Sequence, residues 1–318
     1  MSPLPHKDET SLLVEAAKLY YEDGLTQAQI GRQLQTSRST VSRLLKEARD
    51  KGVVQITIAY PWARDSALER TLTETFDLKD ALVLRSSDRP EDEVIDGLGT
   101  LSAGYLEGIV RDDMVLGVSY GRSIAAAVRH VNGGKYDLTV LQVIGALGSG
   151  NPLQDGPDLA RQLANKYGAT YRYLHAPLLV ESVETRDRLL QEPLVKDLLQ
   201  TAKKADVVLM GISPLTEDAS GLIFTGYLTK KDLKTLKKAG ATGHMCAQFF
   251  GADGELIETP FNKRAVTIGL ETLKTIPTVL TVAGGAEKGA ALRGALIGGY
   301  IDVLVTDDEA ARGALESG

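Results

Sequence analysis

The sequence predicts an α/β protein in two parts: a small N-terminal head of three helices, and a larger body in which a parallel β-sheet lies between layers of helices. Two observations predict this. Two short helical segments joined by a polar break lie within residues 26–52, and from residue 66 onward strand-like runs alternate with amphipathic runs. A chain of 318 residues has room for about two domains. We therefore expect residues 1–59 to form the head and residues 60–318 the body.

Each helix of the head has an apolar side and a capping residue. The first helix carries Leu12, Leu13, Ala16, Ala17, Leu19 and Tyr20, followed by Gly24 at a position typical of a helix C-cap. Thr26 can cap the second helix, whose apolar side carries Ala28, Ile30 and Leu34. Ser37 can cap the third helix, whose apolar face carries Val41, Leu44, Leu45 and Ala48. The three helices should pack together as one small unit.

The other face of the third helix is polar and basic. Two short helices joined by a tight turn, the second with hydrogen-bond donors outside, form the helix-turn-helix arrangement that enters a DNA major groove. Our candidates for reading bases or holding phosphates are Gln27, Arg38, Ser39, Thr40, Ser42, Arg43 and Lys46. The alternatives are a solvated helical hairpin with a basic outer face, or a head that binds protein.

The charge distribution is compatible with double-stranded DNA as a partner, although the formal net charge is -6. Between residues 32 and 51, six basic residues stand against two acidic ones. Such a local excess can hold phosphates while the acidic remainder limits non-specific binding. Residues 53–59 are rich in β-branched residues, which predicts either a short wing or a strand that leads out of the head.

The body is predicted from its alternation of strands and helices. The clearest strands are residues 81–84, 114–118, 138–144, 207–210, 278–282 and 301–305. The helices between them are residues 92–110, 123–131, 157–167, 184–204, 231–239 and 287–297. Such alternation predicts a parallel sheet, and ligands of such sheets bind beyond the carboxyl ends of the strands.

One strand end has the features of an anion site. Ser119, Gly121, Arg122 and Ser123 follow the strand at residues 114–118 and open an alanine-rich helix. Free backbone N–H groups and the helix dipole at such a place favour an anion, and Arg122 could add a direct charge. The alternative is a tight turn that needs Gly121 and a serine cap.

Three further strand ends are rich in small residues and should complete one crevice. They carry Gly145 and Gly148, Gly211, and the pair Gly284-Gly285. Lys288 lies just after that pair and could reach the crevice, or could be a solvated lysine. Asp253 could supply a further polar contact, although Asp253-Gly254 is also an ordinary turn signal.

Other classes of site are not supported by the sequence. One cysteine, Cys246, excludes an intrachain disulfide and a cysteine-based zinc site. The four histidines have no metal or nucleophile spacing, and no phosphate loop or dinucleotide fingerprint follows a strand. We therefore expect no metal and no cofactor. With no long apolar stretch and no secretory signal at the N-terminus, we also expect no membrane span and a cytoplasmic protein.

Several stretches resemble the SorC/DeoR-type sugar-responsive bacterial transcription regulators. They are residues 19–54, G-V-S-Y-G-R-S at 117–123, M-G-I-S at 210–213, and residues 282–307. The resemblance covers nearly the whole chain. It implies a Rossmann-like effector domain similar to ribose-phosphate isomerases and glucosamine-phosphate deaminases, used to sense a phosphorylated sugar. It also implies a homo-oligomer, a dimer or tetramer, that represses or activates a catabolic operon.

The resemblance also assigns roles to residues. It implies that the phosphate binds at Ser119, Gly121, Arg122 and Ser123, that Lys288 faces the ligand, and that Gly145, Gly148 and Gly211 line the sugar. The chain departs from the family pattern at His244 and Gly251, where acidic residues are usual. From the resemblance as a whole we expect a repressor controlled by a small sugar. The rival is a sugar-phosphate isomerase or deaminase carrying a DNA-binding head, which no acid/base pair supports.

Overall fold

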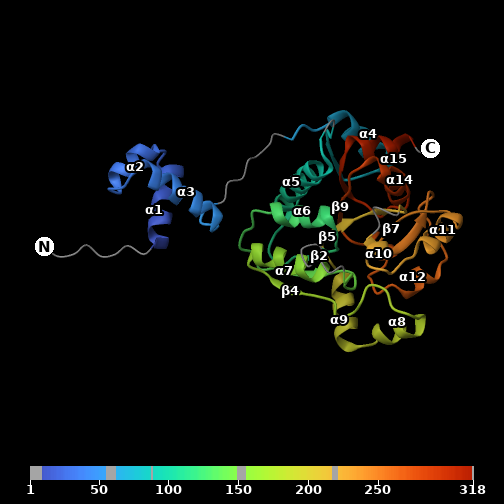
Figure 1. Cartoon of the computed structure of the whole chain (residues 1–318). Helices are drawn as coiled ribbons and strands as arrows, with labels where there is room; N and C mark the ends of the chain where they lie inside the picture. Colours follow the sequence, from blue (N-terminus) through green and yellow to red (C-terminus); the bar gives the residue numbers. More distant parts are fainter. Residues whose placement is uncertain (1–8, 55–61, 87–88, 149–154, 217–220, 317–318) are drawn as a thin grey trace. The chain divides into compact units, whose positions relative to one another are not determined.

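The computed structural model describes residues 9–54, 62–86, 89–148, 155–216 and 221–316 of the chain. These residues form two compact units, Met1–Pro61 and Trp62–Gly318, each of which has its own core (Figure 1). The predicted strand or wing at residues 53–59 falls mostly outside the described residues.

The N-terminal unit contains three helices, α1 (Glu9–Tyr21), α2 (Gln27–Gln33) and α3 (Arg38–Asp50). Its core consists mainly of Ala16, Leu19, Ile30, Val41 and Leu45, all buried. The prediction of Ala28 on the apolar side of α2 is wrong, because Ala28 is exposed. Residues two apart on a helix point about 200° away from each other, so Ala28 and Ile30 cannot share a face.

The second unit is built on a seven-stranded parallel sheet with the strand order β1-β10-β9-β5-β2-β3-β4. Its strands are β1 (Asp80–Leu84), β2 (Val115–Val118), β3 (Thr139–Gln142), β4 (Thr170–Arg172), β5 (Val207–Gly211), β9 (Thr278–Val282) and β10 (Val303–Asp307). All six predicted strands are therefore present. The edge strand β4 was not predicted, because it is only three residues long and shows no clear apolar pattern.

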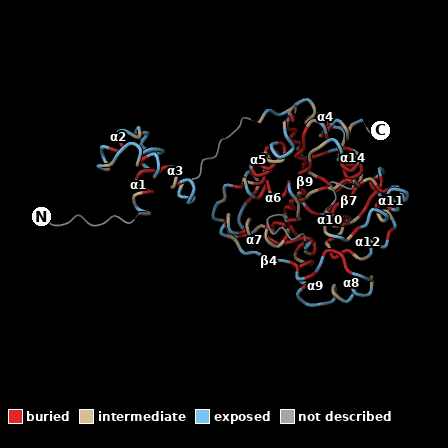
Figure 2. The backbone as a smooth tube through the Cα atoms, in the orientation of Figure 1, coloured by how far each residue is buried: buried red, intermediate tan, exposed pale blue. Residues whose placement is uncertain are grey.

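Helices cover both faces of this sheet (Figures 1 and 2). On one face lie α5 (Glu91–Ile109), α6 (Arg122–His130) and α7 (Gly156–Tyr167). On the other face lie α4 (Ser66–Phe76), α9 (Pro193–Ala202), α14 (Gly289–Ile297) and α15 (Asp308–Glu316). The resulting three layers bury both faces, which explains why the strands read as continuous apolar runs.

The remaining elements lie around the second face. A three-stranded antiparallel sheet, in the order β6-β7-β8, is formed by β6 (Ser213–Pro214), β7 (Ala241–Met245) and β8 (Gln248–Gly251). The smaller helices are α8 (Val183–Leu189), α10 (Gly221–Phe224), α11 (Lys230–Lys238), α12 (Pro260–Arg264), α13 (Leu270–Leu273) and the 3-10 turn η2 (Ala286–Lys288). The single helix predicted over residues 184–204 is two helices, because Pro193 starts a new one.

Candidate functional sites

In the N-terminal unit, the turn between α2 and α3 is fixed by both helix starts. Thr26 and Gln29 form a reciprocal capping box at the start of α2, and the Ser37 hydroxyl accepts the backbone N–H of Thr40 at 3.1 Å. Between the helices, Gln35 adopts a left-handed conformation with φ 51°. Gly31 lies against this turn, where a Cβ atom would be 2.9 Å from the carbonyl oxygen of Thr36. The second helix is therefore held at a defined angle to the first.

The outer face of α3 carries most of the predicted DNA contacts. Arg38, Ser39, Ser42, Arg43 and Lys46 are exposed. Their basic members form no ion pair within the part of the chain that the structure describes. These cations are thus available to an external anion.

The remaining candidates of the head, Thr40 and Gln27, are half-buried. The hydroxyls of Ser39 and Thr40 each lie 2.8 Å from that of Ser37, so both are tied to the helix cap. Gln27 is half-buried at the start of α2. Arg49, which was not predicted as a contact, is exposed and falls close to Ser42 on the helix.

In the second unit, the sheet topology marks one place where a ligand can bind. After β2 the chain adds β3 to one side of the β5–β2 pair. After β5 the next strand of this sheet is β9, which lies on the other side of that pair. β2 and β5 are neighbours, so the strand order reverses between their carboxyl ends. Ligands of open α/β sheets bind in the crevice at such a switch point.

The turn between β2 and α6 lies at this point. Ser119 is 2% exposed. Its backbone N–H donates to the carbonyl of Leu209 at 3.0 Å, and its hydroxyl accepts the N–H of Gly211 at 3.2 Å. Gly121 has φ 118°, which a residue with a side chain rarely adopts, and no side chain caps the N-terminus of α6. The first N–H groups of α6 therefore remain free for an anion.

Two cations from different loops lie near this helix start. Arg122 pairs with Glu91 of α5 at 2.5 Å, an exposed ion pair. Lys288 is half-buried, and burial lowers the pKa of its ammonium group, with Arg122 acting in the same direction and Glu287, Asp307 and Glu91 opposing. Arg122 and Lys288, which come from the loops after β2 and β9, thus lie within electrostatic range of each other.

The position of Lys288 is set by Asp307, the last residue of β10. One carboxylate oxygen of Asp307 accepts the N–H of Gly285 at 2.6 Å, and the other accepts the N–H of Ala310 at 2.8 Å. Burial raises the pKa of this carboxyl group despite both bonds. Asp307 thus accepts a backbone N–H in the first turn of α15, and the same side chain also holds the turn that precedes Lys288.

The two glycines after β3 have different surroundings. Gly145 is buried, and a Cβ atom there would be 2.4 Å from the carbonyl oxygen of Pro177, so backbone packing accounts for this glycine. Gly148 is exposed with φ 66°, and its N–H donates to Asp155 at 2.8 Å. Asp155 also accepts the N–H groups of Leu147 and Gly156 and so organises the loop.

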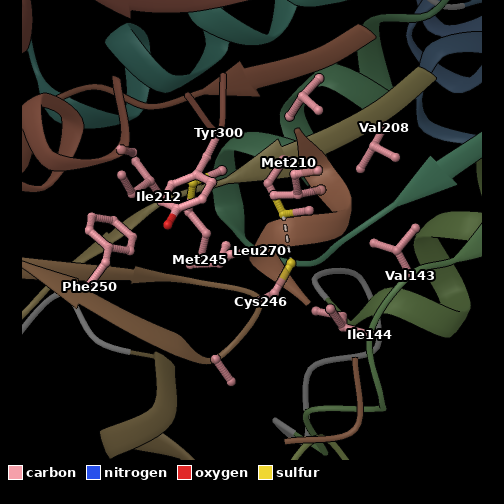
Figure 3. Close-up of a cluster of buried hydrophobic side chains, with 14 of the residues drawn as sticks. Val143, Ile144, Val208, Met210, Ile212, Met245, Cys246, Phe250, Leu270 and Tyr300 are labelled. Atoms are coloured by element: carbon pink, nitrogen blue, oxygen red, sulfur yellow. Dashed lines mark hydrogen bonds between the residues drawn. The ribbon is translucent and has the colours of Figure 1, made fainter. Parts of the chain in front are cut away.

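The tip of the β7–β8 hairpin lies beside the end of β5 (Figure 3). At this tip the Cys246 sulfur lies 3.7 Å from that of Met210, and burial raises the pKa of the Cys246 thiol to about 12. Tyr120 directly follows Ser119, and burial raises its pKa, with Cys246, Asp155 and Tyr227 adding to this. The edge at the switch point therefore has a polar and aromatic border that the sequence did not reveal.

Asp253 does not join the other candidates. It is exposed in the turn after β8, where its carboxylate accepts the N–H of Glu255 at 3.0 Å. The next residue, Gly254, packs against Gly298 at the C-terminal end of α14, whereas Lys288 precedes the N-terminal end of that helix. About 15 Å of helix separates the two ends.

The structure thus brings together Ser119, Gly121, Arg122, Ser123, Gly211 and Lys288, and places Gly148 on the neighbouring loop. It adds Asp307, Asp155, Tyr120, Tyr227 and Cys246. Two signals in the sequence could have identified the two carboxylates: Asp155 precedes Gly-Pro, and Asp307 ends a strand. In the described residues no group of three His, Cys, Asp or Glu could hold a metal ion. No described helix has the length and apolarity needed to cross a membrane.

Comparison with known proteins assigns both units. A family model described as "Putative sugar-binding domain" matches residues 60–316, and the model of sigma-70 region 4 matches residues 17–51. The chain belongs to the SorC/DeoR family of sugar-binding transcriptional regulators. It is therefore a DNA-binding transcriptional regulator with a sugar-binding effector domain.

Full-length relatives agree with this assignment. The deoxyribonucleoside regulator of Bacillus subtilis is 29% identical over 308 residues, covering 96% of this chain and 97% of the relative. The transcriptional regulator LsrR of Klebsiella pneumoniae is 32% identical over 311 residues, covering 96% and 93%. The full-length structure of the sorbitol operon regulator SorC of Klebsiella pneumoniae is 29% identical, with a TM-score of 0.72, covering 98% and 100%. These relatives are regulators, which confirms the expectation that the chain is not an enzyme.

Proposed function

We propose that this regulator binds a phosphorylated sugar at the switch point between β2 and β5, and that this binding controls its affinity for operator DNA. The phosphate would accept hydrogen bonds from the free N–H groups at the start of α6 and from Ser119 and Ser123. Arg122 and Lys288 would supply the compensating charge. The observation that supports this proposal is that these two cations, from different loops, lie within electrostatic range of each other, and that Arg122 opens a helix whose N-terminus no side chain caps.

The sugar end of the ligand would lie toward the loop after β3 and the β7–β8 hairpin tip. Tyr120 and Tyr227 offer hydroxyl groups and ring faces there, and Gly211 leaves room at the end of β5. Gly148, whose N–H donates to Asp155, would border the sugar on this side.

Control of DNA binding requires the ligand to favour one arrangement of the regulator over another. We propose that the regulator acts as a homo-oligomer, a dimer or tetramer, and that sugar binding changes the spacing of its paired heads. Binding to paired half-sites requires a fixed spacing of the two heads, so a modest change in that spacing is sufficient to weaken DNA binding. A tenfold release requires only about 1.4 kcal/mol of coupling. Repression of a sugar catabolic operon is the outcome that we propose.

A thermal-shift screen of the full chain with sugars, the same sugars as phosphates, and inorganic phosphate tests the ligand. A ligand at about 100 times its Kd stabilises the native state by about 2.7 kcal/mol. We expect sugar phosphates to raise the melting temperature, Lys288→Met to remove that rise, and Lys274→Met, a lysine paired with Glu271 elsewhere, to keep it. A rise with unphosphorylated sugars that survives Lys288→Met would refute the phosphate site.

Binding to the promoter upstream of the regulator's own gene tests the head. Arg43→Ala should weaken binding by about 1–3 kcal/mol if Arg43 contacts a base. Lys18→Ala, an exposed lysine on α1, is the control. Sedimentation with and without the stabilising ligand gives the oligomeric state, and a monomer in both conditions would contradict the paired-head mechanism.

A further inference from the structure

Helix α11 (Lys230–Lys238) carries five lysines, at positions 230, 231, 234, 237 and 238. At 100° per residue these five positions fall within a sector of about 120°. We call this sector the lysine face. All five lysines are exposed, while Leu233 and Leu236 on the opposite side are buried in the core of the second unit. The helix lies on the outside of this unit (Figures 1 and 2).

The lysine face does not stabilise its own helix. Lys234 has four lysine neighbours at i±3 or i±4, two on each side. Like charges at such spacings destabilise a helix by about 0.2–0.5 kcal/mol per pair. Lys230 and Lys231 also lie in the first turn, where the helix dipole disfavours positive charge. Lys237 and Lys238 lie in the last turn, where the dipole favours positive charge, but this does not account for the other three lysines on the same face.

Four of the five lysines carry a charge that no described ion pair neutralises. Lys231, Lys234, Lys237 and Lys238 form no ion pair with any residue that the structure describes. The acidic residue of the helix, Asp232, is engaged in the capping box with Thr229, whose hydrogen bonds lower the pKa of Asp232. The charge of these four lysines is thus available to a partner outside this unit.

We propose that the lysine face is a second DNA contact, which holds the phosphate backbone of duplex DNA outside the sequence read by the head. Duplex DNA presents one negative charge per about 1.7 Å, so the roughly 13 Å length of α11 matches a stretch with several phosphates. Lysines act as point charges and suit phosphates without reading bases. The regulator already binds DNA, so the partner is present whenever the head is engaged.

An acidic protein surface fits the lysine face less well. Lysine is depleted at protein–protein interfaces, where aromatic residues, Met and Arg are enriched. The exposed positions of α11 include no large apolar side chain that could anchor a partner. The chain as a whole carries a net charge of -6, so outside the basic face of the head and the lysine face it is acidic on balance. One basic face on an acidic protein would select which side of the second unit approaches the duplex.

Fluorescence anisotropy of the full chain on labelled duplexes tests this proposal. The probes are a duplex of about 60 bp from the promoter upstream of the regulator's own gene, long enough for about six helical turns, and a scrambled duplex of the same length. The variants are Lys234→Gln/Lys238→Gln and the quadruple variant that adds Lys231→Gln and Lys237→Gln. The matched control is Lys203→Gln/Lys204→Gln, two exposed lysines after α9.

We expect the quadruple variant to raise Kd at least tenfold on both duplexes near physiological salt. The slope of log K against log salt should fall by about 0.9 for each phosphate that the variant no longer neutralises, or roughly 2–3 in total. The double variant should lie between the wild type and the quadruple variant, and the control should match the wild type. All positions are exposed, so melting temperatures at or above that of the wild type should verify folding.

An unchanged Kd and salt slope for the quadruple variant would overturn the proposal and leave α11 as a solvated face or a protein-docking surface. A loss of affinity in the control equal to that of the double variant would also overturn the proposal, since the loss would then follow from the total charge of the protein. The sugar response is read in the same assay by adding ligand to the wild type. Failure of the lysine face is therefore distinguishable from failure of the effector site.

Discussion

The carboxylate of Asp307 at the end of β10 accepts the backbone N–H of Gly285 at 2.6 Å, directly after β9. This bond joins two neighbouring strand ends and fixes the turn from which Lys288 projects. A Cβ atom on the preceding Gly284 would lie 2.6 Å from the same carboxylate, so this turn tolerates no side chain there. The lysine that we propose to face the ligand thus depends on a residue that itself need not touch the ligand.

Asp307→Asn should destabilise the second unit and weaken effector binding. The amide side chain can accept only one of the two N–H groups that Asp307 now accepts, and leaving a buried donor unpaired costs about 1–3 kcal/mol. Urea unfolding measures the loss of stability, and a thermal-shift titration with the stabilising ligand measures the loss of affinity. Glu309→Gln, which changes an exposed acid two residues away, should alter neither quantity.

Gly145 and Gly211 should respond differently to alanine. At Gly145 the new Cβ atom would meet the backbone of Pro177 at 2.4 Å, so Gly145→Ala should lower the free energy of unfolding by about 1–3 kcal/mol. At Gly211 the nearest atom would be 3.5 Å away, an ordinary contact, so Gly211→Ala should fold normally. If Gly211 borders the effector, that variant should instead lose ligand affinity. Equal stability of both variants would contradict the packing explanation for Gly145.

In the head, Gly31→Ala should destabilise the helix-turn-helix unit. Its Cβ atom would lie 2.9 Å from the Thr36 carbonyl, so the turn that sets the angle of α3 must shift. We expect a loss of about 1–3 kcal/mol and weaker promoter binding. Far-UV circular dichroism during thermal unfolding, together with DNA titration, measures both. Ala28→Ser, at an exposed position of the same helix, should leave both near the wild-type values.

Those elements that carry strong local signals could be predicted from the sequence. Segments rich in apolar residues identified every strand of the large sheet except the edge strand β4, because both faces of this sheet are buried. The Thr26 and Ser37 caps located α2 and α3 for the same local reason. The antiparallel sheet β6-β7-β8 could not be predicted, since its tightest turn uses Cys246 and Ala247 with φ 52° and 55° where glycine or asparagine would be the usual signal.

The candidate site was predictable only where a strand end carried its own marker. The Ser119–Ser123 turn and Lys288 were found in this way. Asp155 and Tyr120 were missed, because their meeting depends on the order of strands in the sheet, which no local pattern contains. Asp253 was selected for a turn that lies at the other end of α14, and a sequence cannot show which end of a helix a distant turn reaches.

His244 should make the stability of the regulator depend on pH below neutrality. It is 2% exposed, its ring packs against Phe249 with 5.1 Å between ring centroids, and its Nε2 atom has no hydrogen-bond partner in the described residues. Burial lowers the pKa of His244 from 6.5 to about 4. In the unfolded chain the imidazole regains its ordinary pKa, so between about pH 6.5 and pH 4 the unfolded state binds more protons. The stabilisation is therefore complete above about pH 6.5 and is lost as the pH falls toward about 4, by about 3 kcal/mol.

Urea unfolding near neutral pH and at two points within this acidic window should show the loss of stability. His244→Phe keeps an aromatic ring without a titrating group and should remove that part of the pH dependence, because neither state of the variant gains a proton there. His175→Gln, at an exposed histidine, should retain it. An identical pH dependence in His244→Phe and the wild type would show that other groups cause it.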